Sequence, residues 1–237
     1  MRKRIWELDA LRGLCVLGMV IIHLMYDVVE LYRLVDWSYP TVFLFIRDWG
    51  GVLFLLISGI CVTLGSHPVR RGIAVFVCGL LCTAVTGGMV ILDYAGKGMI
   101  IWFGVLHCLG ICMLLWPLFR KLPVVVLAVL ALCLVAAGFY LDSCVRVSFP
   151  WLIPFGVVFP GFSSSDYFPL LPHLGFFLLG AVLGRTLYRK KESLVPGIDP
   201  QKPIPAFLCF CGKHSLWIYL LHQPVLTAVL SLITLFQ

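Results

Sequence analysis

The chain alternates long apolar segments with short polar stretches, and this pattern restricts it to folds that a lipid bilayer can hold. A helix of about 20 apolar residues crosses the hydrocarbon core, and it satisfies its own backbone polar groups, as lipid requires. Segments of this kind occupy residues 8–32, 41–65, 70–94, 99–119, 122–142, 168–188 and 209–236. We therefore predict an all-α, polytopic membrane protein with about seven transmembrane helices.

The composition supports this class, since 61% of the 237 residues are hydrophobic and only 12% are charged. The segment 149–162 is also apolar, but it is short and contains three prolines. We interpret it as a re-entrant or interfacial segment, with an eighth span as the alternative. The polar stretch 189–205 contains four further prolines and is expected to be a solvated linker. Because we find no internal repeat, residues 1–237 are expected to form a single transmembrane domain.

The basic residues are divided unequally between the two sets of alternate loops. Short cytoplasmic loops carry most of the Lys and Arg residues of a membrane protein, so we expect the N-terminus in the cytoplasm and an uncleaved first helix. This orientation places Arg33, Lys97 and Arg146 outside and the other loop residues inside: Arg2, Lys3, Arg4, Arg70, Arg71, Arg120, Lys121, Arg185, Arg189, Lys190, Lys191, Lys202 and Lys213. Basic cytoplasmic loops that face anionic lipid headgroups then explain the net charge of +7. We therefore do not expect nucleic acid as a partner.

The ten cysteines lie mostly inside apolar segments, as Cys108 and Cys112 do. None shows the loop spacing of a zinc site or of a disulfide framework. We therefore expect small apolar side chains here and no metal ion.

Three of the ionisable residues in the first predicted span share one helical face, and such groups are costly in hydrocarbon, where by default they mark a site facing the protein interior. His23 and Asp27 are one helical turn apart, and Arg12 precedes His23 by close to three turns, so all three share one face. Arg12 and His23 are then roughly 16 Å apart along the helix. Arginine binds phosphate through bidentate charged hydrogen bonds, and histidine suits proton transfer because its usual pKa is about 6.5.

We predict His23 and Asp27 as catalytic residues, with Asp27 holding the imidazole in one tautomer. Arg12 is the predicted ligand of a phosphate-containing cofactor. Two alternatives stay open: Arg12 snorkels to lipid phosphates, and the His–Asp pair links helices.

Seven further polar residues at membrane depth or near its outer edge are candidates for binding substrate: Arg47, Asp48, His107, Asp166, His173, His222 and Gln223. Each has a structural alternative. Arg47 and Asp48 can form an ion pair with another helix, and His107 can be a hydrogen-bonded packing residue between close helices.

For Asp166 and His173 the alternative is to cap and anchor the sixth predicted span. His222 and Gln223 directly precede Pro224, so they can instead satisfy the backbone carbonyls that a proline leaves free. His67 and His214 lie at predicted cytoplasmic helix ends, and we leave them out of the site.

Four stretches together resemble one known family: LDALRGLCVLGMVIIHLMYD, WFGVLHCLGI, DYFPLLPHLGFFLLGAVLGR and CGKHSLWIYLLHQPV. The chain resembles the heparan-alpha-glucosaminide N-acetyltransferase catalytic-domain family over nearly its whole length, and most closely its short bacterial members. The resemblance implies a transmembrane acyltransferase that takes an acyl group from cytoplasmic acyl-CoA and transfers it to a sugar outside. By the same resemblance, His23 corresponds to the catalytic histidine, and Arg12 lies near the CoA phosphates.

The resemblance also implies acetyl-CoA as the acyl donor, a bacterial cytoplasmic (inner) membrane, and a sugar or cell-envelope glycan as acceptor. The other expected partners are membrane lipid and, as an open alternative, a second copy of the chain in a homo-oligomer. The animal lysosomal enzyme has a lumenal domain and several spans that this chain lacks, so heparan specificity is not transferred. A transporter or a non-catalytic membrane scaffold is the competing function, because the same charges would also form a polar pathway or link helices.

Overall fold

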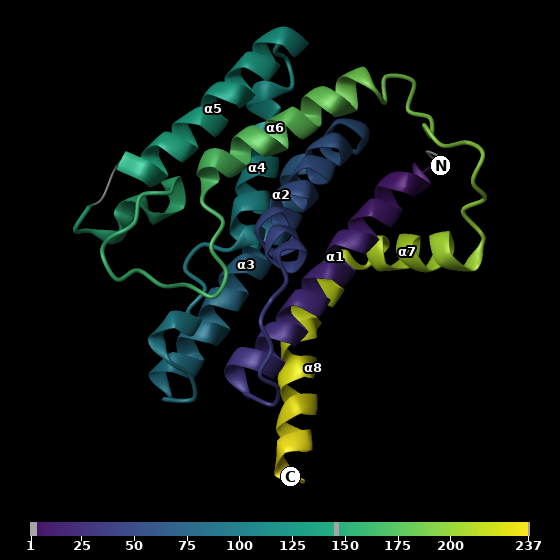
Figure 1. Ribbon diagram of the computed structural model, residues 1–237. Helices are drawn as coiled ribbons and strands as arrows, with labels where there is room; N and C mark the ends of the chain where they lie inside the picture. Colours follow the sequence, from purple (N-terminus) through teal and green to yellow (C-terminus); the bar gives the residue numbers. More distant parts are fainter. Residues whose placement is uncertain (1–3, 145–146, 237) are drawn as a thin grey trace. The chain divides into compact units, whose positions relative to one another are not determined.

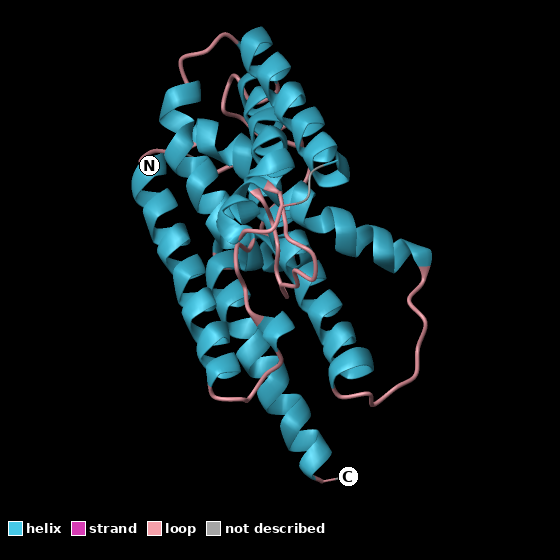
Figure 2. Ribbon diagram, turned by 90° about the vertical axis from the view of Figure 1, so that its left-hand side faces the viewer, coloured by secondary structure: helices cyan, strands magenta, loops and turns pink. Residues whose placement is uncertain are grey.

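The computed structural model describes residues 4–144 and 147–236, and these residues form helices and loops (Figure 1). The α-helices are α1 (Trp6–Tyr26), α2 (Thr41–Leu64), α3 (Pro68–Ile91), α4 (Val105–Phe119), α5 (Val124–Cys144), α6 (Leu170–Thr186), α7 (Pro203–Lys213) and α8 (Ser215–Leu235). Among the described residues there is no strand, only one isolated bridge between Phe103 and Tyr167. Figure 2 shows the same helices from a second direction. The all-α prediction is confirmed.

Five segments are long and apolar enough to cross a membrane: Trp6–Leu31, Thr41–Leu64, Pro68–Ile91, Val124–Ser143 and Ser215–Leu235. The first of these continues α1 through a π-helix at Asp27–Leu31. Three shorter apolar helices accompany them, namely α4, α6 and α7. The protein is therefore an integral membrane protein, while the count of seven spans and the cytoplasmic N-terminus stay predictions. Arg2, Lys3 and Arg146, which enter the orientation prediction, lie outside the described residues.

The predicted spans differ from the helices in two places, at 99–119 and 209–236, while 149–162 is short, as predicted. The span predicted at 99–119 begins as a helix only at Val105, because a 3₁₀ turn at Lys97–Met99 and an extended Gly104 precede it. The last predicted segment, 209–236, is divided between α7 and α8 by a non-helical residue, His214. The segment 149–162 contains a short 3₁₀-helix at Pro150–Phe155, and no described helix there is long enough to cross a bilayer.

The chain forms two compact units. Unit 1 comprises residues 1–54 and 190–237, with α1, the first part of α2, α7 and α8. Unit 2 comprises residues 55–189, with the rest of α2 and α3 to α6. That both units belong to one transmembrane domain stays a prediction.

In unit 1, α1 and α7 approach so closely that their contact requires glycine. A Cβ atom at Gly13 would meet the carbonyl oxygen of Leu208, and a Cβ atom at Gly212 would meet that of Asp9. Small residues at such positions let helix backbones pack directly against each other. The α1–α7 packing therefore depends on these two glycines.

We expect the Gly13→Ala variant to unfold more easily than the wild type, by about 1–3 kcal/mol, because the added methyl group overpacks the α1–α7 contact. Gly18→Ala is the matched control on the same helix, since nothing lies within 4 Å of a Cβ atom there. It should be neutral, or stabilising by up to about 1 kcal/mol, through helix propensity. Thermal unfolding of both variants in detergent measures the difference, and equal behaviour would contradict the packing described.

In unit 2, contacts at small residues define the directions of the helices. Gly72 lies against Gly110 and Gly79 against His107, so α3 and α4 are antiparallel. In the same way, α5 is antiparallel to α6, and α2 runs parallel to α6. Several basic residues at helix ends therefore lie at the same end of unit 2. We call this end the basic end, and its residues are His67, Arg70, Arg71, Arg120, Lys121 and Arg185.

Candidate active site

Two histidines lie next to each other in unit 1, one from α1 and one from α8. The ring centroids of His23 and His222 are 4.8 Å apart, in an edge-to-face arrangement. Nδ1 of His23 lies 2.9 Å from the Met19 carbonyl oxygen, and Nδ1 of His222 lies 2.6 Å from that of Tyr219. Because a carbonyl only accepts hydrogen bonds, Nδ1 carries the proton in both rings. When neutral, each ring therefore presents the lone pair of its Nε2 atom.

Two buried polar atoms of α8, one of them in this pair, have no hydrogen-bond partner within the described part of the chain. They are Nε2 of His222 and Oε1 of Gln223, neighbours in sequence on α8. Buried polar atoms in native proteins are nearly always paired. Both atoms accept hydrogen bonds, so they are candidate contacts for a ligand with O–H or N–H groups.

Asp27 forms hydrogen bonds with a residue of α8. Its side chain is only 1% exposed, and the Gln223 amide nitrogen donates to both carboxylate oxygens, at 3.0 and 2.9 Å. Asp27 was expected to hold the His23 tautomer, but the Met19 carbonyl accepts from Nδ1 of His23, and both oxygens of the Asp27 carboxylate accept from Gln223. The structure thus assigns the tautomer of His23 to its own helix and gives Asp27 a different partner. A catalytic role for Asp27 stays a prediction.

Arg12 also faces the interior of unit 1. Its Nη2 atom donates to the Ser215 hydroxyl at 2.9 Å, and the guanidinium carbon lies 5.9 Å from the centre of the Phe54 ring. The buried Nε atom has no partner among the described residues. A guanidinium has five N–H donors, so Arg12 retains donors for an anion. The sequence analysis did not predict Ser215, the first residue of α8, because it lies 203 residues away from Arg12 in the chain.

Arg47 and Asp48, at the start of α2, bond to each other. Arg47 Nε donates to Asp48 Oδ1 at 2.8 Å, and about half of each side chain is exposed. The described residues show no contact between this pair and the two histidines. Their role in binding substrate stays a prediction.

His107 belongs to unit 2 and is fully engaged there. It is 3% exposed, its Nδ1 atom accepts the Gly104 N–H at 3.2 Å, and its Nε2 atom lies 3.3 Å from the Thr83 hydroxyl. The ring packs between Phe76 and Phe103. These contacts favour the packing alternative over the predicted contact with substrate.

The two candidates of unit 2 near the predicted outer edge, Asp166 and His173, also make structural contacts. Asp166 Oδ2 accepts the Val105 N–H at 3.0 Å, so it caps α4 rather than α6. Nδ1 of His173 lies 2.6 Å from the Pro169 carbonyl oxygen. In the same loop, Tyr167 donates to the Ile153 carbonyl at 2.7 Å, and burial raises the pKa of its phenol. Binding of substrate by Asp166 and His173 stays a prediction.

Glu7 is a buried carboxylate that sequence reasoning missed. It accepts hydrogen bonds from the Ser193 hydroxyl and the Leu194 N–H, both at 2.8 Å. The stretch 189–205 was expected to be a solvated linker, and most of it is exposed, while Glu7 attaches its first part, at Ser193 and Leu194, to the first turn of α1. The only signal in the sequence was an acidic residue just before an apolar helix, which is common at helix N-termini.

Comparison with known proteins identifies one family. Residues 4–224 match the family model described as heparan-alpha-glucosaminide N-acetyltransferase, catalytic. This range includes every residue predicted for the site. No curated protein and no solved structure matches the chain.

Proposed function

The chain belongs to the heparan-alpha-glucosaminide N-acetyltransferase catalytic family, and from this premise we propose how it acts. Family membership makes the protein a membrane acyltransferase. We propose that it takes an acetyl group from cytoplasmic acetyl-CoA and transfers it to an amine or hydroxyl of an extracytoplasmic acceptor. The proposed acceptor is a sugar or glycan of the cell envelope of a bacterium, with the protein in the cytoplasmic membrane.

The observation that supports this function best is the His23–His222 pair, with its two fixed tautomers. Nε2 of His23 takes the proton of the acceptor O–H or N–H as that group attacks the thioester carbonyl carbon. A new O–C or N–C bond forms, and the C–S bond breaks. The CoA thiolate then takes the proton back from the His23 imidazolium.

The unpaired atoms on α8 would position the acceptor. His222 Nε2 and Gln223 Oε1 both require a hydrogen-bond donor, and amines and hydroxyls supply one. Asp27, buried one turn after His23, places negative charge near the imidazolium that forms during transfer. Holding the acceptor in this way converts a bimolecular attack into a local one.

Arg12 is the proposed contact for the phosphates of the donor. It lies on the same helix as His23, roughly 16 Å away, so an extended CoA molecule reaches both. Ser215 fixes the orientation of the guanidinium without a competing carboxylate. A preoriented arginine with free donors is well suited to phosphate.

Arg12→Gln is expected to weaken acetyl-CoA binding about tenfold or more, because it removes a charged hydrogen bond to phosphate. Isothermal calorimetry on detergent-purified protein measures this change. Arg33→Gln is the matched control, because Arg33 is exposed and lies beyond the other end of α1. It should bind as the wild type does.

Equal affinities of the Arg12→Gln and Arg33→Gln variants would remove Arg12 from the donor site. A folded wild-type protein that does not bind acetyl-CoA at all would argue for a transporter or scaffold instead.

A further inference from the structure

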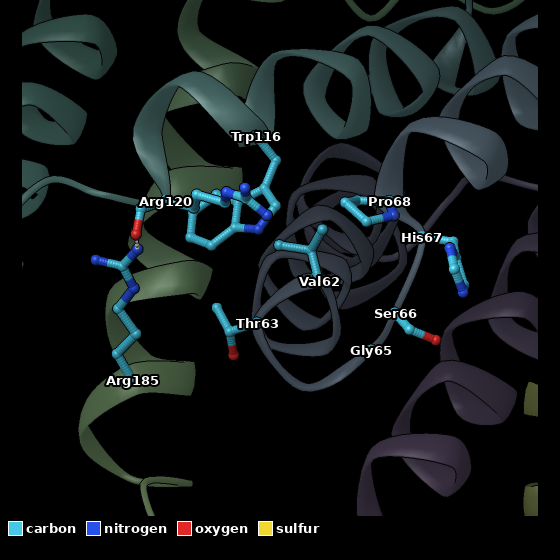
Figure 3. Close-up of a pocket in the computed structure, with 9 residues that line it drawn as sticks. All are labelled: Val62, Thr63, Gly65, Ser66, His67, Pro68, Trp116, Arg120 and Arg185. Atoms are coloured by element: carbon cyan, nitrogen blue, oxygen red, sulfur yellow. Dashed lines mark hydrogen bonds between the residues drawn. The ribbon is translucent and has the colours of Figure 1, made fainter.

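A cavity of about 370 Å³ opens at the basic end of unit 2. Its walls come from the loop between α2 and α3, from the end of α4 and from the end of α6. Figure 3 shows Arg120 and Arg185 on one side of the cavity and Ser66 and His67 on the other, with Trp116 nearby. Nothing in the proposed acyl transfer uses these residues.

Arg185 is held rigidly at the cavity. Its guanidinium donates to the backbone carbonyls of Leu122, at 2.7 Å, and Arg120, and it stacks 5.0 Å from the centre of the Trp116 ring. These bonds use two of its five N–H donors. A preoriented guanidinium loses little side-chain entropy when it binds an anion, which favours tight binding.

Three other lining residues add positive charge or further hydrogen-bond donors. Arg120 contributes a second guanidinium, and Ser66 and His67 contribute a hydroxyl and an imidazole. None of the described residues that line the cavity carries a carboxylate. In the described part of unit 2, the acidic residues lie at its opposite end: Asp93 follows α3, Asp142 is in the last turn of α5, and Asp166 precedes α6. No acidic side chain of unit 2 therefore competes with an anion here.

We propose that this cavity binds a phosphate group. Two arginines with open donors, a hydroxyl and an imidazole match the oxygens of a phosphate ester. Two sources share this chemistry, namely the headgroup of an anionic phospholipid and the nucleotide part of a CoA molecule. The inference concerns other residues than Arg12, and only its CoA source rests on the proposed function.

Arg120→Gln tests the proposal with little risk to the fold. The Arg120 side chain is exposed, and the carbonyl that holds Arg185 remains in the variant. Lys121→Gln is the matched control, since it removes the same charge from the next residue, which does not line the cavity. The probes are dihexanoyl-phosphatidylglycerol and CoA, each titrated by calorimetry into lipid-free protein in neutral detergent.

We expect Arg120→Gln, but not Lys121→Gln, to weaken the binding of one probe about tenfold or more. Selective loss for phosphatidylglycerol identifies a lipid headgroup as the ligand, and selective loss for CoA identifies the nucleotide phosphates. Either result supports a phosphate site. If the two variants bind each probe with the same affinity, or if neither probe binds the wild type, the proposal is overturned.

Discussion

Replacement of His23 by alanine is expected to lower acyl transfer by about 10²–10⁴-fold while the protein stays folded. The loss is large because no other described group of α1 presents a base at this position, and the Met19 carbonyl holds the Nε2 lone pair of His23 ready. Release of CoA thiol from acetyl-CoA in the presence of an acceptor measures the rate.

The matched control for this variant is His214→Ala. His214 is an exposed histidine between α7 and α8 whose Nδ1 atom lies 2.9 Å from the Phe210 carbonyl oxygen. This substitution removes an imidazole of the same size from outside the site, so the rate should stay close to that of the wild type. Turnover by His23→Ala at the rate of the control would exclude the proposed general base.

The Gln223→Leu variant is expected to be the most destabilised of the side-chain variants in the site. Gln223 donates to both oxygens of Asp27, which is 1% exposed, so the variant leaves a buried carboxylate without this donor. Removal of a partner from a buried charged group costs about 1–3 kcal/mol or more. Thermal unfolding can be followed with a thiol-reactive dye, because Cys209 and Cys211 of unit 1 are buried until the protein unfolds, while the exposed Cys133 reacts in the folded protein and sets the baseline.

Two further variants separate the charge from the hydrogen bond. Asp27→Asn removes the charge but retains an oxygen that accepts from Gln223, so it should unfold close to the wild-type temperature. The double variant Asp27→Leu with Gln223→Leu replaces both partners by apolar groups and should recover most of the lost stability. If Gln223→Leu unfolds at the wild-type temperature, the Asp27–Gln223 contact does not stabilise unit 1.

Activity of the Asp27→Asn variant adds a separate test of the catalytic prediction. If the negative charge stabilises the imidazolium of His23, acyl transfer should fall although the fold is retained. Unchanged transfer would leave Asp27 with a structural role alone. The stability and activity measurements together therefore decide between the two roles.

Hydropathy predicted the long helices, because a span in lipid must satisfy its own backbone polar groups. Each long apolar helix that the structure describes overlaps one predicted segment, although the ends differ by a few residues. The breaks inside apolar sequence were harder to predict. His214 interrupts one apolar segment, and Asp27 begins a π-helix inside another. Both breaks contain polar residues, Lys213 and His214 in one and Asp27 in the other, but a window of about 20 residues averages them with their apolar neighbours.

Only the spacing of site residues within one helix could be predicted from the sequence. Periodicity placed Arg12, His23 and Asp27 on one face of α1, since the spacing within a helix is fixed. The partners on α8 are nearly 200 residues away, and no local pattern indicates that Gln223 meets Asp27 or that His222 meets His23. Asp166 shows the same limit, because it caps α4 from 61 residues away.

The measurement that tests the central claim most directly is transfer of a labelled acetyl group by the wild-type protein. Permeabilised membrane vesicles that contain the protein would receive acetyl-CoA labelled in its acetyl group, together with a panel of amino sugars and envelope glycans. We predict label in an acceptor and release of one CoA thiol for each acetyl group transferred, with both signals absent from vesicles that carry His23→Ala. If folded wild-type protein releases no more CoA than vesicles without it, the proposed acetyl-CoA-dependent transfer is contradicted.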